Sequence, residues 1–580
     1  MTDALMNHTQ DVREEYLDLT EKVQLDNSVS DITYISREPE SGRFNIGDTI
    51  RIVLNPTSNW LLPSRAYLYV EGALVRGDGT PYEKDEQGEY PNITLVNNAI
   101  MHMFSIATYS INDFQVESFG NPGYATLMRG LVSKTKSFRG LDQCWSIDTY
   151  NGSYNRKHAY YPMQRLTDTE MQTAGANPTA DEYRRIMKMI IPVFNHTNNT
   201  NITQLADTDL PCAAANPTVN EINTGFQNLV RRINNSVDAP TIEDPTAIPT
   251  ASSNDLRKHV NDVIRIVNNT TVMKRHFLER YNTGFAERKN FLFNQTDNLI
   301  PNENAGRFSF RIPLSFVFNF CGEYDKLIFN CKHEISFTRQ EDKYAIFRDN
   351  NTAAGKIRLD KIKLYMPVVT PTSVCKEDLT SIIKNMEDVP MAFRSKKIET
   401  FVIPPSLETF SVRLIFGDGI DKPRFIVIAV QAKPNNTADD QYNTSIFNVP
   451  TDDLTHQINV KKITTTFNDK IITTDYVNNF ARNEAARWYN DFKNFRKSYY
   501  GDMMEDNVVD YQDYVNLYRL YVWDLNKQPE FTTYGTANVR LDFELNLPTP
   551  VDYTTTVYAL SFFDRMFVLR SDGTKQYVVQ

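Results

Sequence analysis

Short runs of apolar residues, separated by polar turns, recur along most of this 580-residue chain. One of the most apolar is FIVIAV at 425–430, which holds no polar side chain. Six residues are too few to cross a membrane as a helix, which needs about 20. The run therefore predicts a strand buried on both faces, with its second face covered by another barrel of the chain or by a neighbouring subunit. The core residues that we predict in it are Phe425, Ile426, Val427 and Ile428.

A second strand is predicted in YLYVE at 67–71, where aromatic and acidic residues alternate with aliphatic ones. We predict that Tyr67 and Tyr69 also contribute to the core. Further strands are predicted throughout 34–165, 306–371 and 396–467, and in the last 60 residues of the chain.

Two segments depart from the strand pattern. Residues 172–252 are rich in Asn, Thr, Pro and Ala and lack sustained periodicity, which predicts a long exposed insertion of loops. A helix is predicted next, over Leu256–Val267, with Asn254 or Asp255 as its cap. Residues 476–520 are predicted to form a helical, aromatic-rich interruption.

The two strand-rich halves of the chain match each other in order. A Pro and an Arg precede a dense apolar strand in both PSRAYLYVEGALV (63–75) and KPRFIVIAVQAK (422–433). In each half, this strand follows a candidate hairpin. KLIFNCKHEISF (326–337) parallels NVRLDFELNL (538–547) later in each half. Two copies of an eight-stranded antiparallel unit predict an all-β chain with a tandem, or double, jelly roll.

Composition narrows the class of protein. The net charge of −10 argues against a chain that coats phosphate backbones. No apolar run approaches membrane-spanning length, and the start of the chain lacks a basic segment followed by an apolar one, which predicts a protein that is not secreted. Five scattered cysteines suit reduced thiols inside a cell; they are Cys144, Cys212, Cys321, Cys331 and Cys375.

No pattern of catalytic residues is found. Phosphate-binding loops, dinucleotide fingerprints and nucleophile elbows are missing from the sequence. Cys321, Cys331 and His333 lie near one another, but their spacing fits no standard zinc module, and we interpret Cys331 and His333 as alternating residues of a buried strand. We therefore predict no catalytic, cofactor-binding or metal site.

Several segments resemble the major capsid proteins of Polinton (Maverick) elements, which are related to those of adintoviruses and virophages. The segments occur in colinear order and cover most of 30–175 and 290–580; they include 312–348 (IPLSFVFNFCGEYDKLIFN…), 355–371 (GKIRLDKIKLYMPVVTP), 422–431 and 564–579 (DRMFVLRSDGTKQYVV). Residues 172–290 do not match the family.

The resemblance implies two upright eight-stranded barrels with loop and helix insertions. It also implies a pseudo-hexagonal homotrimeric capsomer that self-assembles into an icosahedral virion shell and is made inside the host cell. Penton and minor capsid proteins are the further partners that it implies, without specific nucleic-acid binding. The domains that we predict are an N-terminal arm (1–30), a first jelly roll (31–375, with the insertion at 172–290) and a second jelly roll (376–580).

Two other classes of protein remain open. One is a double jelly-roll glycan-binding protein or glycan hydrolase, which would need convergent carboxylates and tryptophan platforms. The four tryptophans show no grouping along the sequence. The other is a host-captured descendant with a non-viral role, which an intact reading frame with complete terminal strands disfavours.

Overall fold

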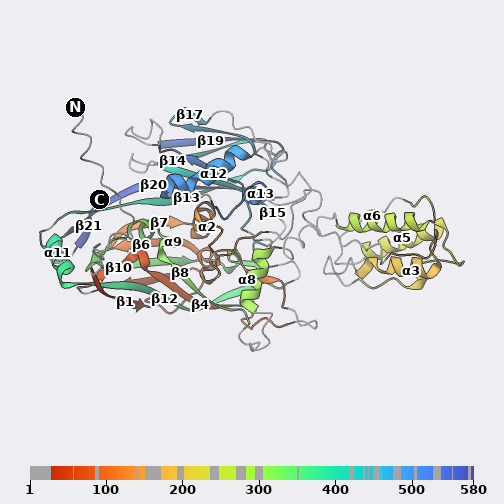
Figure 1. Cartoon of the computed structure of the whole chain (residues 1–580), viewed down its shortest axis with the longest axis horizontal. Helices are drawn as coiled ribbons and strands as arrows, with labels where there is room; N and C mark the ends of the chain where they lie inside the picture. The colour runs from red at the N-terminus through yellow and green to blue at the C-terminus, as the bar shows by residue number, and fades with distance from the viewer. Residues whose placement is uncertain are drawn as a thin grey trace, which may run out of the picture.

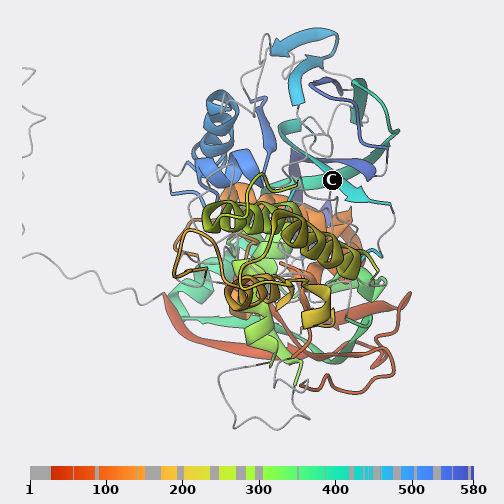
Figure 2. The same cartoon turned by 90° about the vertical axis from the view of Figure 1, so that its right-hand side faces the viewer.

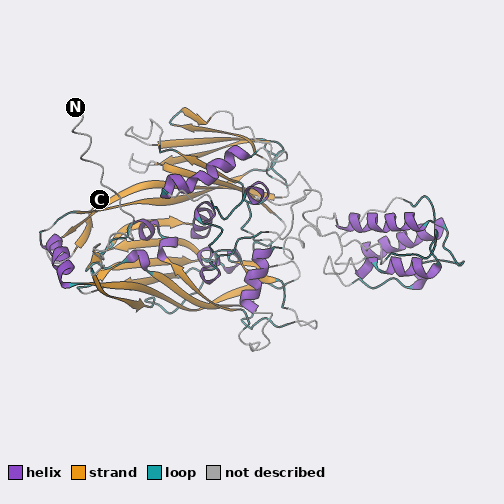
Figure 3. Cartoon of the chain, in the orientation of Figure 1, coloured by secondary structure: helices purple, strands orange, loops and turns teal. Residues whose placement is uncertain are grey.

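The structure is a computed structural model of the whole chain (Figure 1). Most of the described elements are strands, and three helices lie apart from them (Figure 3). The residues that the structure describes are 28–56, 58–84, 90–138, 140–149, 171–192, 202–235, 247–268, 282–293, 305–348, 352–385, 387–416, 423–435, 438–441, 443, 445–447, 458, 460–473, 485–501, 506–526, 537–551, 553–571 and 576–579. The predicted N-terminal arm lies almost entirely outside them.

The first half of the chain forms a six-stranded and a four-stranded antiparallel sheet. The four longest strands of the six-stranded sheet have the order β8-β4-β12-β1, with β8 (Arg307–Pro313), β4 (Tyr67–Arg76), β12 (Gly355–Pro371) and β1 (Val29–Arg37). The other has the order β2-β10-β6-β7, with β2 (Thr49–Leu54), β10 (His333–Arg339), β6 (Phe104–Ile111) and β7 (Phe114–Gly120).

The second half repeats this arrangement. Its first sheet has the order β18-β15-β20-β13, with β18 (Leu520–Asp524), β15 (Pro423–Pro434), β20 (Tyr553–Ser571) and β13 (Val389–Ile403). Its second sheet has the order β14-β19-β16-β17, with β14 (Thr409–Phe416), β19 (Ala537–Leu545), β16 (Val460–Phe467) and β17 (Lys470–Thr473).

Strand for strand, the two halves have the same sheet order and the same chain order. Eight antiparallel strands in two such sheets are a jelly roll, so the chain is a double jelly roll, as predicted. β4 and β15, the strands that the sequence comparison paired, occupy the same place beside the long last strand of each barrel. The predicted duplication is therefore confirmed.

Further strands and helices lie outside the eight main strands of each barrel. The additional strands are β3 (Trp60–Leu61), β9 (Ile328–Phe329), β5 (Ile93–Leu95), β11 (Ile346–Arg348) and β21 (Gln576–Val579). The helices are α1 (Ala99–His102), α2 (Pro122–Ser133), α8 (Thr283–Phe293), α9 (Leu314–Val317), α10 (Asn319–Glu323), α11 (Ser373–Lys384), α12 (Ala486–Tyr500) and α13 (Tyr511–Asn516). No described helix combines the length and apolar character needed to cross a membrane.

Strand alternation explains how the sheets build their cores. In β14, Phe410, Val412, Leu414 and Phe416 are buried and the residues between them are exposed. One face of such a strand packs inward while the other remains in water. The prediction of a strand over 314–320 was wrong, because α9 and α10 follow β8 there. Phe318, between the two helices, and Phe320 of α10 are buried in the core instead.

The insertion folds into a small helical bundle of α3 (Ala180–Lys188), α5 (Val219–Asn234) and α6 (Ser253–Asn268). Its apolar residues form a core of their own that shares no residue with the core of the barrels. Figure 1 shows the bundle standing apart from the sheets, and Figure 2 views the chain from the bundle's side. The prediction of unstructured loops over 172–252 was wrong for α3 and α5.

Two nearly identical motifs begin α3 and α5. In NPTADE, Thr179 caps the helix and Glu182 completes a capping box; in NPTVNE, Thr218 and Glu221 do the same. The predicted helix over 256–267 is present as α6. Its cap is Ser252 rather than Asn254 or Asp255, because the Ser252 hydroxyl accepts the Asp255 backbone N–H at 3.1 Å.

Candidate functional site

Strand β15 lies where the two jelly rolls meet. All six residues of 425–430 are buried, including Phe425, Ile426, Val427 and Ile428. The Phe425 ring lies 5.2 Å from Phe495 and 5.4 Å from Tyr499, both on α12. Alternate residues of a strand point to opposite faces, so the Phe425 face is covered by helices and the Ile426 face lies toward the second sheet of its barrel.

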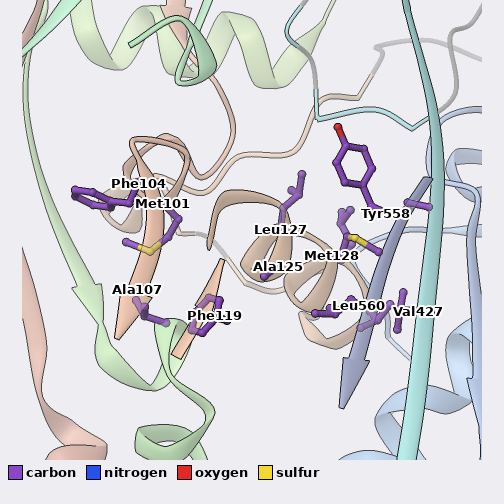
Figure 4. Close-up of a cluster of buried hydrophobic side chains, with 14 of the residues drawn as sticks. Met101, Phe104, Ala107, Phe119, Ala125, Leu127, Met128, Val427, Tyr558 and Leu560 are labelled. Atoms are coloured by element: carbon purple, nitrogen blue, oxygen red, sulfur yellow. The ribbon is translucent and has the colours of Figure 1, made fainter. Parts of the chain in front are cut away.

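The first jelly roll also covers this face. Helix α2 contacts β20, the strand beside β15, and the Tyr124 ring of α2 stacks on Tyr558 at 4.1 Å. Figure 4 shows Met128 of α2 beside Leu560 and Val427. The second face of β15 is therefore covered within the chain, by α12 and by the first barrel.

Tyr67 and Tyr69 are placed differently from the prediction. Both are half-buried on the outer face of β4, and Leu68 and Val70 line the core instead. The Tyr67 ring stacks on Tyr365 at 4.9 Å. The alternation predicted the strand correctly, but aromatic residues suit either face of a sheet, so it did not identify the inward one.

A fully buried ion pair joins the two barrels. The Lys396 ammonium of β13 lies 3.3 Å from the Glu117 carboxylate of β7, and both side chains are 0% exposed. Lys396 also donates to Asn319 Oδ1 at 3.0 Å, and Glu117 accepts the Phe320 backbone N–H at 2.9 Å. Burial lowers the pKa of Lys396, and the Glu117 carboxylate opposes this shift.

A second polar cluster continues this contact. Asn319 Nδ2 donates to the backbone oxygen of Arg394 at 2.8 Å, and the Arg394 N–H donates to Glu323 at 2.9 Å. The Tyr499 hydroxyl donates to the same Glu323 carboxylate at 2.5 Å, and the Arg394 guanidinium lies 4.0 Å from the Tyr499 ring. Helix α10 of the first barrel is thus hydrogen-bonded to β13 and α12 of the second.

Asp148 makes another buried connection between the halves. Its carboxylate is paired with Arg288 at 2.7 Å and accepts the backbone N–H and hydroxyl of Ser445, each at 2.7 Å. The Tyr518 hydroxyl donates to the Asp148 backbone oxygen at 2.8 Å. Burial acts to raise the pKa of Asp148, but Arg288 and Ser445 outweigh it and the pKa lies below its ordinary value.

The Arg348 side chain of β11 adds a third buried pair. Its Nε lies 2.6 Å from Asp440 Oδ2, and the two side chains are 9% and 7% exposed. Removing one partner of a buried pair leaves an uncompensated charge, so such pairs fix the relative position of the parts they join. Two buried ion pairs, Lys396–Glu117 and Arg348–Asp440, therefore cross the junction of the barrels, and the hydrogen bonds of Asp148 to Ser445 cross it as well.

The interpretation of Cys331 and His333 as residues of one buried strand is correct for His333 alone, because Cys331 lies between β9 and β10. His333 is buried on β10 and its Nδ1 is hydrogen-bonded to the Tyr109 hydroxyl at 2.8 Å. Burial lowers the pKa of His333 to about 3, so the ring is neutral. Within the described parts of the chain, no group of three or more His, Cys, Asp or Glu side chains is placed to hold a metal ion.

Two features bear on the glycan alternative. The structure brings Trp488 and Trp523 together at 5.5 Å, a pair that the sequence did not reveal, but both are buried and neither offers a platform for a sugar. An open cleft of about 770 Å³ beside α12 contains Asp524 and Asp564. Asp564 is paired with Arg424 at 2.6 Å and is half exposed, which is unlike the apolar setting of a general acid.

Two matching barrels joined by buried ion pairs define a double jelly-roll protein. A family model described as a double jelly roll-like domain matches residues 254–567, more than half of the chain, so the chain belongs to this family. A search of curated protein sequences gives no match.

Solved structures of virus capsids resemble the chain over nearly its whole length at low identity. The Sputnik virophage structure has 10% identity over 98% of this chain and 93% of the other, with a TM-score of 0.45. The mavirus major capsid protein has 10% identity over 98% and 95%, with a TM-score of 0.40. The Faustovirus major capsid protein has 7% identity over 97% and 92%, with a TM-score of 0.42.

Proposed function

We propose that the chain is a structural major capsid protein, not an enzyme, and that it assembles as a homotrimer into the icosahedral shell of a Polinton-like DNA virus. The observation that carries the proposal is the junction of two matching barrels, which buries the Lys396–Glu117 ion pair. A shell subunit must hold its contact surfaces at fixed angles, and such a junction does so. Membership of the double jelly roll-like family and the sequence resemblance to Polinton capsid proteins support it.

The proposed division of the chain follows the sheets. β12 ends the first barrel at Pro371, α11 follows, and β13 begins the second barrel at Val389. We therefore place the boundary between the jelly rolls at about 375, with residues 1–30 as an arm and the virion as the location of the protein. Penton and minor capsid proteins are its proposed further partners.

Purified protein is expected to form particles near three times 66.9 kDa in mass photometry. Closed icosahedral particles in negative-stain images at higher concentration would support the shell. A monomer at every concentration tested would contradict the proposal.

Replacing the whole bundle, 171–268, with a short Gly/Ser linker is expected to leave the soluble trimer intact, because the bundle has its own core. Size-exclusion chromatography and soluble yield measure this. A matched partial deletion of 176–250 is expected to aggregate, since it strips α3 and α5 from the buried apolar residues Leu256, Val260 and Val263 of α6. Loss of soluble protein in the full replacement would show that the bundle supports the barrels.

A further inference from the structure

Three polar side chains meet in the apolar interior where the two barrels join. They are Lys396 of β13, Glu117 of β7 and Asn319 of α10, and all three are buried. The Lys396 Nζ donates to Asn319 Oδ1 at 3.0 Å and lies 3.3 Å from Glu117 Oε1. An amine, a side-chain amide and a carboxylate are therefore in contact in a part of the protein that is closed to solvent.

Aromatic side chains enclose this cluster. The Lys396 Nζ lies 4.1 Å from the centre of the Phe119 ring. Phe119 lies 6.0 Å from Phe318, and the Phe320 ring lies 5.3 Å from Phe393, with all four rings buried. Apolar surroundings disfavour charge, so a proton passes from the ammonium to the carboxylate more easily here than in water, which leaves both groups neutral. Burial lowers the pKa of Lys396 in the same sense.

The Asn319 amide is oriented for reaction with this amine. Its Nδ2 donates to the Arg394 backbone oxygen at 2.8 Å and to the Tyr499 hydroxyl at 3.2 Å, which directs its Oδ1 toward Lys396. The amide carbon Cγ is one C=O bond, about 1.2 Å, from Oδ1. A small rotation therefore brings Cγ to the attack distance of about 3–3.5 Å from Nζ. A lysine amine in an apolar pocket is an effective nucleophile.

We propose that Lys396 and Asn319 become joined by an isopeptide bond, with Glu117 as the proton carrier. The bond forms once the chain has folded, because only folding brings together residues that are 77 positions apart. This inference goes beyond the proposed capsid function and does not depend on assembly. The ion pair of Lys396 with Glu117 is the state that precedes the reaction.

The reaction exchanges one amide for another. Glu117 accepts a proton from the Lys396 ammonium, and the neutral Nζ attacks Asn319 Cγ. The Nζ–Cγ bond forms and the Cγ–Nδ2 bond breaks. Of the three ammonium protons, one stays on the new amide nitrogen, one goes to Nδ2, which leaves as ammonia, and one stays on Glu117 as a carboxylic acid. The product is favoured because neither charge of the pair remains buried.

The bond ties the two jelly rolls together covalently. Asn319 precedes the connection through α11, and Lys396 follows it on β13. The bond therefore closes a loop that contains this connection, and a closed loop restricts the unfolded chain. The barrels then stay attached to each other through two covalent routes when either one opens.

The mass of the denatured wild-type chain tests the proposal. Full-length folded protein, denatured for mass spectrometry, is expected to weigh one ammonia molecule less than its sequence mass of 66.9 kDa. Tryptic digestion is expected to yield a branched peptide in which 312–326 is joined to 395–397 through Lys396. The full sequence mass overturns the proposal, and so does ammonia loss with 312–326 recovered as a linear peptide.

The measurement is made on single denatured chains, so its failure is distinct from the failure of the proposed function. An unmodified chain contradicts the isopeptide bond alone, whereas a monomer in mass photometry contradicts the capsid assembly.

Variants assign the role of each residue. Asn319→Ala is expected to keep its full sequence mass, whereas Asn319→Asp is expected to lose water instead of ammonia and to restore the branched peptide. Glu117→Gln, with circular dichroism to establish its fold, is expected to keep its full mass. The matched control Lys397→Arg changes the next, exposed residue of β13 and is expected to retain the bond. A branched peptide in folded Glu117→Gln would overturn the role of Glu117, and its absence in Lys397→Arg would overturn the assignment to Lys396.

Discussion

Replacing Lys396 with Met is expected to lower the free energy of unfolding by about 3–5 kcal/mol, because it leaves the Glu117 carboxylate buried without its partner. The lost hydrogen bond to Asn319 adds to the effect. Urea unfolding followed by tryptophan fluorescence measures the change, since Trp145, Trp488 and Trp523 are all buried.

Lys397 is the matched control for this prediction. It is the next residue on β13, its side chain is 50% exposed, and it pairs with Glu399 at the surface. Lys397→Met is therefore expected to cost less than about 1 kcal/mol. The double variant Lys396→Met with Glu117→Gln should recover part of the lost free energy of unfolding, because neither residue of the pair then carries a charge. Equal effects of Lys396→Met and Lys397→Met would show that the pair does not hold the barrels together.

The double variant Ile426→Asp and Ile428→Asp is expected to abolish soluble folded protein. Both side chains are 0% exposed, and two carboxylates there would have no partner in the barrel core. Circular dichroism and soluble yield report the outcome. Truncation of either isoleucine to Ala is expected to cost about 2–5 kcal/mol.

The exposed Ile415→Asp serves as control, since it lies on a strand of the same barrel and faces water. It should leave the yield unchanged. A soluble, fully folded Ile426/Ile428 double variant would mean that β15 can leave the core. That outcome would contradict the placement of β15 between the second sheet of its own barrel and the first barrel.

The strands and their duplication could be predicted from the sequence because an uninterrupted run of apolar residues is a local pattern. Phe425–Val430 could be identified as buried on both faces without any knowledge of the fold, since no polar residue interrupts it. The inward face of β4 was harder to predict, because Tyr67 and Leu68 are both common in sheets. Which of these side chains points inward depends on the residues that pack against the strand.

The helices of the insertion carried a signal that was missed. Thr179–Glu182 and Thr218–Glu221 each have the spacing of a capping box, and Ile222, Phe226, Leu229 and Ile233 follow at helical spacing. The surrounding Asn, Thr and Pro, typical of loops, hid this periodicity. In the structure those same residues terminate and cap the helices.

The junction could not be predicted from the sequence. Glu117 and Lys396 are 279 residues apart, and neither has a neighbour in sequence that indicates burial. Asp148 and Ser445 are separated by 297 residues. Pairs of this kind become apparent only when the topology brings distant strands together, since local periodicity carries no information about long-range partners.

The separate core of the bundle has a consequence for how this protein changes over generations. A substitution in the bundle alters packing among residues such as Tyr183, Phe226 and Val260, none of which touches the barrel core. Residues of the bundle core can therefore change together without any compensating change among the residues that pack inside the barrels.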